Sequence, residues 1–421
     1  MISTAKLQKT LYPLLWPFGL LYALLMRLRR YAYAKKIFKA YRPKVFTIAV
    51  GNIAAGGTGK TPLVDFLLRR ASEAGLRAVV LTRGYKARSP KLPFLVKKDS
   101  SPWQAGDEPL MLARKNPQAF VVVDPKRSRA AKFAEQELGP DIFLLDDGLQ
   151  HLALGRHKNI VLLRPEDIEA DWNKVLPAGI WREDESALDA ADVFLLRLPS
   201  RAANALASNQ ALLQQAALKL PQRPLFPFVF ENYALRPVNL AAQQVLQKAR
   251  SLPDEEKEPE ALEFGPLAGT PVPDVGLTAK DDPFVSSEVG AADSYESIYL
   301  FSGLAAHLSG RPYVLLCAVG SPHRVKEGAE QLLGYAPQHV YALPDHYPFG
   351  LHDVTTLNNL GLDVVCTEKD AVKLEALMSD PGDCPLWALQ GRLYFLPSHG
   401  GGTGESFSEW LSSNLPNKAK I

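Results

Sequence analysis

The sequence predicts an α/β fold in which a parallel sheet is covered by helices on both faces. Two observations support this prediction. A glycine-rich turn at 51–62 lies between an apolar run and a helical pattern, and apolar runs alternate with helical stretches after it. Apolar strands alternating with helices are typical of a buried parallel sheet, whose ligands bind at the carboxyl ends of the strands. With 421 residues, the chain is long enough for two or three domains.

The composition is that of a globular protein with a sizeable core. Of the residues, 47% are hydrophobic and 22% are charged, and the formal net charge is only +3. This small charge, without a basic patch interleaved with aromatic residues, argues against a nucleic-acid-binding protein. The three cysteines, Cys317, Cys366 and Cys384, lack the spacing of metal ligands and cannot all pair, which indicates a reducing compartment.

The first 40 residues form a segment of their own. Leu11–Met26 carries no charge, and six basic residues follow it: Arg27, Arg29, Arg30, Lys35, Lys36 and Lys39. The run is shorter than the roughly 20 residues of a spanning helix, is interrupted by Pro13 and Pro17, and lacks the pattern of a signal peptide. We expect a helix lying on the cytoplasmic leaflet, with its arginines on anionic headgroups. A core helix of a soluble domain and a full membrane span remain open as alternatives.

The glycine-rich turn runs from Gly51 to Pro62, after a predicted strand at Val45–Val50 and before a predicted helix at Leu63–Arg70. This is the order of a phosphate-binding loop, in which backbone N–H groups enclose an anion, a lysine charges the outer phosphates and a threonine ligates Mg²⁺. The expected nucleotide-binding residues are Ala54, Ala55, Gly56, Gly57, Thr58, Gly59, Lys60 and Thr61. Ala54 departs from the Walker A pattern, which has glycine there, and a surface turn is the alternative.

Further strands are predicted at Ala78–Thr82, Ala119–Val123, Ile142–Leu145, Ile160–Leu163 and Val193–Leu196. The third of these runs is followed by Asp146 and Asp147. Two carboxylates at a strand end facing a phosphate loop are typical of a Mg²⁺ site, although Asp-Asp-Gly is also common in turns.

A second unit is expected from Pro224, with strands at Phe228–Asn232, Tyr313–Val319, Gln338–Ala342 and Val364–Cys366. Residues 251–296, rich in glutamate and proline and without clear periodicity, are expected to be a disordered insertion in it.

Four more residues are candidates for chemistry. Asp107 either caps the helix that follows it or accepts a proton from a substrate hydroxyl, and the spacing favours the cap. Arg182 and Glu183 either balance phosphate charge and reach the metal, or form a surface ion pair. His346 follows Asp345, and a histidine held by an aspartate is a proton acceptor, although this pair alone is weak support.

These motifs occur in a fixed order: Gly51–Pro62, Arg83-Gly84-Tyr85, Gly106-Asp107-Glu108-Pro109, Asp146-Asp147-Gly148-Leu149-Gln150-His151, Leu176-Pro177-Ala178-Gly179, Arg182-Glu183, Asp345-His346 and Thr367-Glu368-Lys369-Asp370. The ordered set resembles the tetraacyldisaccharide 4'-kinase (LpxK) family of Gram-negative bacteria over nearly the whole chain, to about Leu396.

The resemblance implies a P-loop NTPase-like three-layer αβα domain at 41–224 and a second, smaller αβα domain at 225–421, after a membrane-associated helix at 1–40. It implies a β-ribbon hinge between the domains, with the nucleotide at their interface. ATP, with Mg²⁺, would phosphorylate the 4'-hydroxyl of a tetraacylated disaccharide 1-phosphate to form lipid IVA at the cytoplasmic face of the inner membrane. The partners implied are this lipid and the anionic membrane surface, with neither nucleic acid nor an obligate protein partner.

The resemblance also assigns roles to residues. The catalytic aspartate falls on Asp107 and its partner histidine on His346, with Lys60 and Arg182 as catalytic cations. The metal ligands fall on Thr61, Asp146, Asp147 and Glu183. The chain departs from the family pattern at Trp181, at Leu149 and in the length of 251–296, and none of these departures changes a charged site residue.

Two other functions fit the loop less well. Membrane-associated ATPase switches of the MinD and ParA type have a lysine where this chain has Ala55, and they usually carry the membrane helix at the C-terminus. A non-catalytic nucleotide-binding adaptor would not need Asp107, Asp146, Asp147 and His346 together.

Overall fold

The computed structural model describes residues 4–199, 206–250, 311–396 and 406–416. The predicted insertion at 251–296 lies outside the described residues. The chain divides into two compact units, one formed by Met1–Glu231 with Arg392–Ile421 and the other by Asn232–Gly391. The sequence assigns all of 225–421 to a second domain, whereas the structure groups the C-terminal helix α14 (Phe407–Asn414) with the first unit. The reason is aromatic packing, because the Phe407 ring lies 5.7 Å from that of Phe226 and 4.6 Å from that of Phe395.

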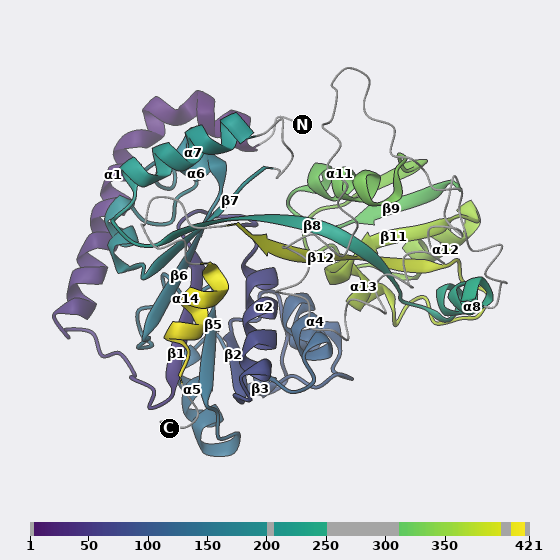
Figure 1. The fold of residues 1–421 in the computed structure, drawn as a ribbon, viewed down its shortest axis with the longest axis horizontal. Coiled ribbons are helices and arrows are strands. Elements are labelled where there is room, and N and C mark those ends of the chain that lie inside the picture. Colours follow the sequence, from purple (N-terminus) through teal and green to yellow (C-terminus); the bar gives the residue numbers. More distant parts are fainter. Residues whose placement is uncertain (1–3, 200–205, 251–310, 397–405, 417–421) are drawn as a thin grey trace, which may run out of the picture. The chain divides into compact units, whose positions relative to one another are not determined.

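The first unit is built on a largely parallel sheet with the strand order β8-β7-β6-β1-β5-β2-β4-β3 (Figure 1). Its strands are β1 (Phe46–Asn52), β2 (Ala78–Thr82), β3 (Phe94–Leu95), β4 (Phe120–Val123), β5 (Ile142–Asp146), β6 (Lys158–Leu163), β7 (Val193–Arg197) and β8 (Leu225–Pro237). Strand β1 lies between β5 and β6, and in this register Val50 is opposite both Asp146 and Ile160. The edge strand β3 alone among these runs antiparallel to its neighbour. The carboxyl ends of β1, β2, β5 and β6 therefore meet at one edge of the sheet.

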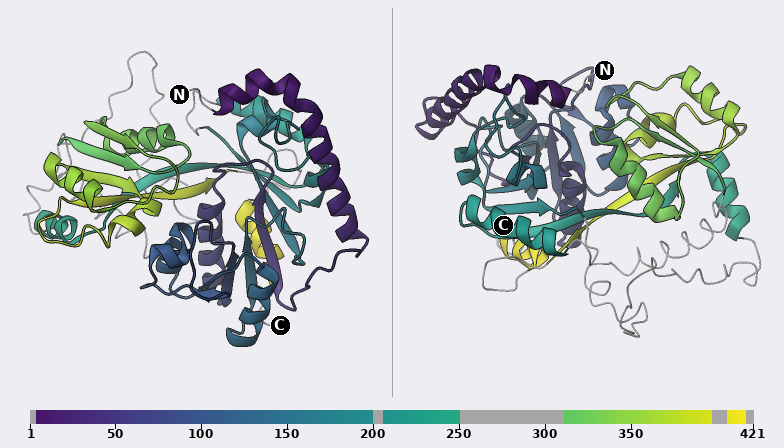
Figure 2. Two further views of the ribbon diagram at one scale, coloured as in Figure 1. Left: turned by 180° about the vertical axis from the view of Figure 1, so that it is seen from behind. Right: turned by 90° about the horizontal axis from the view of Figure 1, so that it is seen from above.

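Helices cover both faces of this sheet. The helical elements of the unit are α1 (Thr4–Ala34), α2 (Lys60–Glu73), α3 (Pro102–Ala105), α4 (Asp107–Lys115), α5 (Arg127–Glu137), α6 (Pro165–Ile168), η1 (Glu185–Ala190), α7 (Leu206–Lys219) and α14. In the strand order, the chain passes from β1 to β2 in one direction across the sheet and from β4 to β5 in the opposite direction. Because connections between parallel strands are right-handed, the connecting helices α2 and α5 lie on opposite faces (Figure 2). The alanines of α5, Ala130 and Ala134, pack against Val79 and Phe143 of the sheet. The predicted three-layer α/β fold is confirmed.

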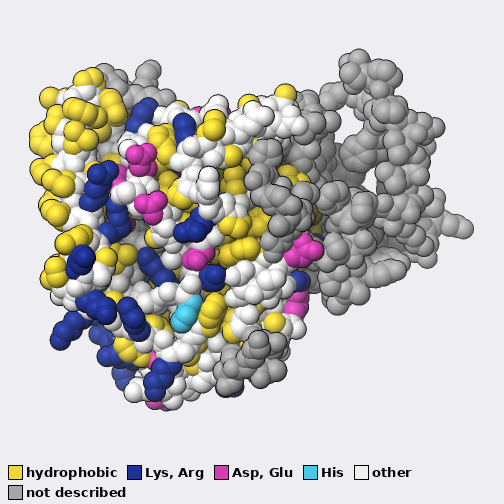
Figure 3. All heavy atoms as spheres, turned by 60° about the vertical axis from the view of Figure 1, so that its left-hand side comes forward, with side chains coloured by type: hydrophobic (Ala, Val, Ile, Leu, Met, Phe, Trp, Pro, Cys, Tyr) yellow, Lys and Arg dark blue, Asp and Glu magenta, His cyan; other side chains and the backbone are white. Residues whose placement is uncertain are grey.

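Helix α1 is longer than the predicted apolar run and is continuous through Pro13 and Pro17. Each proline lacks an N–H donor, and the helix bends over its length rather than ending (Figure 2). One side of α1 is covered by the rest of the unit, and the other is exposed and apolar (Figure 3). The exposed side chains are Leu11, Leu14, Trp16, Phe18, Leu20, Leu21, Leu24, Leu25, Leu28 and Tyr31. Over Leu11–Ala34 the helix is long and apolar enough to cross a membrane, but length and composition alone are weak evidence that it does.

The second unit is a smaller three-layer α/β structure with the strand order β10-β9-β11-β12-β8. Its described elements are α8 (Leu240–Arg250), β9 (Tyr313–Cys317), α11 (Pro322–Leu333), β10 (His339–Ala342), α12 (Leu351–Leu360), β11 (Asp363–Thr367), α13 (Glu368–Leu374) and β12 (Leu386–Phe395). Helices α12 and α13 pack on the face formed by Val314, Val364 and Leu386, and α8 and α11 pack on the face formed by Leu315 and Trp387. All three cysteines lie in this unit, buried and unpaired.

Candidate active site

The phosphate-binding loop joins the end of β1 to the start of α2. Gly56 and Gly59 have φ angles of 105° and 93°, which a side chain would strain. Gly59 is also the N-cap residue of α2, and as a glycine it has no side chain to cap the first turn. The hydroxyl of Thr58 is buried without a hydrogen-bond partner among the described residues. A helix start without a side-chain cap, next to an unpartnered hydroxyl, fits an anionic ligand.

The loop is held from one side by residues 174–184, which we call the bracing segment. The N–H of Ala55 donates to the carbonyl of Ile180, and the N–H of Arg182 donates to that of Ile53, both at 2.8 Å. Ala54 forms a bridge with Trp181, is buried and does not have a positive φ, so glycine is not needed at that position. The backbone conformation at Ala54 therefore explains why this position can be alanine, where the Walker A pattern has glycine.

Lys60, Asp147 and Arg182 lie together at the end of β5. The Lys60 Nζ atom donates to Asn52 Oδ1 at 2.9 Å and lies 3.4 Å from Asp147 Oδ1. The Nη1 atom of Arg182 donates to both carboxylate oxygens of Asp147, at 2.9 and 2.8 Å. Burial opposes ionisation of Asp147, but the charges of Lys60 and Arg182 outweigh it and hold the pKa of Asp147 below its usual value. The two cations are thus already positioned against a carboxylate.

Asp146 lies in a different environment from its neighbour. It accepts a hydrogen bond from the Thr82 hydroxyl at 2.9 Å, while Thr61 donates to Glu108 at 2.7 Å. Burial, and then the charge of Glu108, raise the pKa of Asp146 to about 6. Asn52, Thr82 and Glu108 were not expected from the sequence to take part in the site. Their positions at the ends of β1 and β2 and next to Asp107 are the signals by which sequence reasoning could have found them.

The residues here suit Mg²⁺ bound together with a nucleotide. Within the described ranges, no group of three or more histidine, cysteine, aspartate or glutamate side chains forms a metal cage. Mg²⁺ usually takes only one or two carboxylates, with the remaining ligands from water and substrate phosphates. The hydroxyl of Thr61 and the carboxylates of Asp146 and Asp147 provide such a partial set.

Asp107 is the first residue of α4 and is half-buried. The N-cap is Gly106, with a φ of 88°, so the interpretation of Asp107 as the cap is wrong. The reason is that the glycine turns the chain one residue earlier than the spacing suggests. A carboxylate in the first turn of a helix is stabilised by the helix dipole.

Glu183 faces α1. Its hydrogen-bonding partner in the described part of the chain is Arg30, and it is 1% exposed. Burial raises its pKa, and Arg30 opposes this effect. Arg30 also pairs with Asp184, at 3.0 Å. Arg27 forms a second ion pair with Asp184. The structure thus brings Arg182, but not Glu183, into contact with Asp147. Arg27 and Arg30, which were expected to contact lipid headgroups, pair with carboxylates of the protein instead.

His151 is half-buried beside several arginines, and its Nε2 atom has no hydrogen-bond partner among the described residues. Burial, and then the positive charges of Arg127, Arg156, Arg29 and Arg83, together lower its pKa to about 4. The imidazole is therefore neutral at pH 7. Of these arginines, Arg127 and Arg156 were not expected from the sequence to lie near the site.

In the second unit, Lys369 joins His346 to Asp345. The Lys369 Nζ atom lies 2.6 Å from Asp345 Oδ1 and 3.1 Å from His346 Nε2. Because an ammonium group only donates, Nε2 accepts and the ring hydrogen is on Nδ1. The motif that begins at Thr367 has a structural role as well, since Thr367 caps α13 and Asp370 accepts a hydrogen bond from the N–H of Ala318 at 2.9 Å. The tautomer is fixed by Lys369 and not directly by Asp345, whose Oδ1 atom lies 3.7 Å from the same Nε2 atom and accepts from the lysine.

Comparisons with known proteins identify the family. Residues 11–263 and 277–403 match the family described as tetraacyldisaccharide-1-P 4'-kinase, LpxK. The chain is 39% identical over 412 residues to a tetraacyldisaccharide 4'-kinase of Nitratidesulfovibrio vulgaris, covering 97% of this chain and 96% of that protein. It is 37% identical over 414 residues to the enzyme of that name from Oleidesulfovibrio alaskensis, covering 97% of each.

The fold resembles a solved structure of LpxK from Aquifex aeolicus in complex with ATP. The TM-score is 0.60 and the sequence identity is 23%, over 92% of this chain and 95% of that one. The family predicted from the ordered motifs is confirmed: the chain belongs to the tetraacyldisaccharide-1-P 4'-kinase (LpxK) family.

Proposed function

We propose that this protein transfers the γ-phosphate of ATP to the 4'-hydroxyl of a tetraacyldisaccharide 1-phosphate, forming lipid IVA. The observation that carries the proposal is the grouping of Lys60, Asp147 and Arg182 at the end of β5, beside the phosphate-binding loop, in a chain of this family. Of the loop residues from Ala54 to Thr61, those other than Ala55, whose N–H donates to Ile180, would offer their N–H groups to the phosphates. Lys60 and Arg182 balance the charge that develops on the transferred group.

Mg²⁺, when bound with ATP, would neutralise phosphate charge. Thr61, Asp146 and Asp147 would hold it. Glu183, expected as a fourth ligand, pairs with Arg30 in the structure, and we propose a different role for it below.

A sugar hydroxyl is a poor nucleophile until a base accepts its proton. We assign that role to Asp107, the first residue of α4. His346, with Nε2 as the acceptor, is assigned as its partner. The two residues belong to different units of the chain.

The exposed apolar side of α1 supports membrane association. The acceptor is a lipid that stays in the membrane, and α1 presents ten exposed large apolar side chains with basic residues beyond them. We propose that the protein acts at the cytoplasmic face of the inner membrane, held by α1. Single-cysteine labelling from each side of the membrane distinguishes a helix that spans from one that lies in the leaflet.

One assay tests the function and its nearest rival. Radiolabelled ATP, membranes and the disaccharide 1-phosphate are incubated with the protein, and the lipid is separated by thin-layer chromatography. Transfer of label to the lipid supports the kinase. Nucleotide-dependent dimerisation with no labelled lipid would instead favour a switch of the MinD and ParA type, which the family match does not favour.

A further inference from the structure

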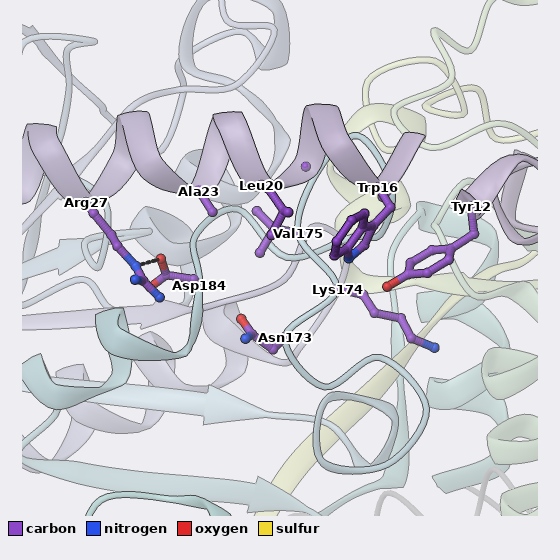
Figure 4. Close-up of a pocket in the computed structure, with 11 residues that line it drawn as sticks. Tyr12, Trp16, Leu20, Ala23, Arg27, Asn173, Lys174, Val175 and Asp184 are labelled. Carbon is purple, nitrogen blue, oxygen red and sulfur yellow. Dashed lines mark hydrogen bonds and ion pairs between the residues drawn. The ribbon is translucent and has the colours of Figure 1, made fainter. Parts of the chain in front are cut away.

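The bracing segment joins the phosphate-binding loop to α1. On the loop side it makes the two backbone hydrogen bonds at Ala55 and Arg182. On the helix side, Ala23 packs against the buried cluster that contains Val175, and Leu20 lines the same pocket as Val175 (Figure 4). A Cβ atom on Gly19 would lie only 3.2 Å from the carbonyl oxygen of Val175, so a larger residue at this position would crowd the segment. Contact between helix and loop is therefore continuous through one short segment.

The segment itself is compact. The N–H of Trp181 donates to the carbonyl of Lys174 at 3.0 Å, and the N–H of Leu176 donates back to the carbonyl of Trp181 at 2.9 Å. Trp181 is fully buried and makes an edge-to-face contact with Trp172 at 5.2 Å. Because the turn is closed by its own hydrogen bonds, a displacement on one side is transmitted to the other rather than absorbed.

Two consecutive side chains connect the two sides. Arg182 donates to both oxygens of Asp147, and Glu183 pairs with Arg30 on α1. Glu183 and Asp184 are 1% and 2% exposed, so their charges depend on the arginines of α1. A buried carboxylate that loses its cation must either take up a proton or move to water. Movement of Glu183 would rotate the backbone that aims Arg182.

We propose that Arg30 is a positioning residue for phosphoryl transfer. By holding Glu183, it fixes the peptide that sets Arg182 against Asp147, so the helix that meets the membrane also orders the nucleotide site. This inference rests on the proposed function, since it concerns the rate of that reaction. In this proposal Glu183 is not a metal ligand. It links Arg30 of α1 to the residue that precedes it, Arg182 of the nucleotide site.

The test compares kinetics with membrane binding for Arg30→Gln, Glu183→Gln and the double variant. We expect each single variant to lower kcat about tenfold, because small misplacements of catalytic groups have effects of this order or larger. Flotation with vesicles containing phosphatidylglycerol should be unchanged, because the apolar side of α1 is intact. The double variant should be no worse than Arg30→Gln alone, since Arg30→Gln has already broken the ion pair that Glu183→Gln removes.

Three further measurements separate positioning from simple damage. Arg30→Lys, which keeps the charge, should recover part of kcat. Arg70→Gln removes an arginine from an exposed ion pair with Glu73 in the same unit and should leave kcat unchanged. Gly19→Ala crowds Val175 without altering a charge and should lower kcat several-fold, so it tests the connection even if Arg30→Gln does not fold.

The outcomes are distinguishable from failure of the function itself. If the unaltered protein transfers no phosphate to the lipid, the proposed function fails. If it does, and Arg30→Gln and Gly19→Ala keep normal kcat, the positioning role is refuted. Loss of activity that matches loss of vesicle binding, or additive effects in the double variant, would also refute it.

Discussion

Trp181 gives the sharpest test of how the bracing segment supports the first unit. Its side chain is fully buried, and its indole Nε1 atom has no hydrogen-bond partner among the described residues. Trp181→Ala therefore removes packing without removing a side-chain hydrogen bond. Large-to-small substitutions of a buried tryptophan cost about 3–5 kcal/mol. In a domain of this size, each kcal/mol of lost stability lowers the midpoint of thermal unfolding by about 2–4 °C. Trp181→Ala should therefore lower this midpoint by roughly 10 °C.

Calorimetry on the unaltered protein and on Trp181→Ala measures this shift. Trp103→Ala is the matched control, because Trp103 is 55% exposed and its loss should change stability by about 0.5 kcal/mol or less. The KM for ATP should also rise in Trp181→Ala, since Trp181 lies against Ala54 in the phosphate loop. A shift below 2 °C, or equal shifts in the two variants, would refute the reasoning.

Three other predictions concern the loop, the acidic pair and the helix. Lys60→Met should abolish ATP binding measured by calorimetric titration; unchanged affinity would contradict the phosphate-loop assignment. Asp146 has its pKa raised from 3.8 to about 6, so its contribution to the stability of the unliganded protein is fully present below pH 4 and is lost as the pH rises through 6. Asp146→Asn should remove that part of the pH dependence of the thermal midpoint, and an unchanged profile would show that Asp146 titrates normally. Leu21→Glu with Leu25→Glu, on side chains 56% and 51% exposed, should abolish flotation with anionic vesicles without changing the thermal midpoint; retained flotation would rule out this side of α1 as the membrane contact.

Most of the first unit could be predicted from its sequence because local patterns agree with the tertiary structure. The apolar run before Gly51 is β1, and Lys60 begins α2, one turn earlier than the expected start at Leu63. Asp146 and Asp147 lie at the end of β5, beside Lys60, as the order of a parallel sheet requires. In such a sheet, position along the chain already determines which strand ends share an edge.

Contacts between distant segments could not be predicted in this way. Glu183 follows Arg182 directly, and only the packing of α1 shows that the two side chains serve different partners. The sequence pattern likewise gave Asp107 as a helix cap, because it does not show that Gly106 adopts a positive φ. Pro13 and Pro17 were expected to interrupt the N-terminal helix, yet α1 continues through both. Each of these differences arises from backbone geometry or long-range packing.

The central claim is that phosphate passes to the 4'-hydroxyl of the lipid and not to water. The most direct measurement follows γ-labelled ATP with two acceptors, the tetraacyldisaccharide 1-phosphate and its 4'-deoxy analogue, and identifies the product by mass spectrometry. We predict one added phosphate on the first acceptor, none on the second, and loss of transfer in Asp107→Asn. Label released only as inorganic phosphate, or equal labelling of both acceptors, would contradict the account.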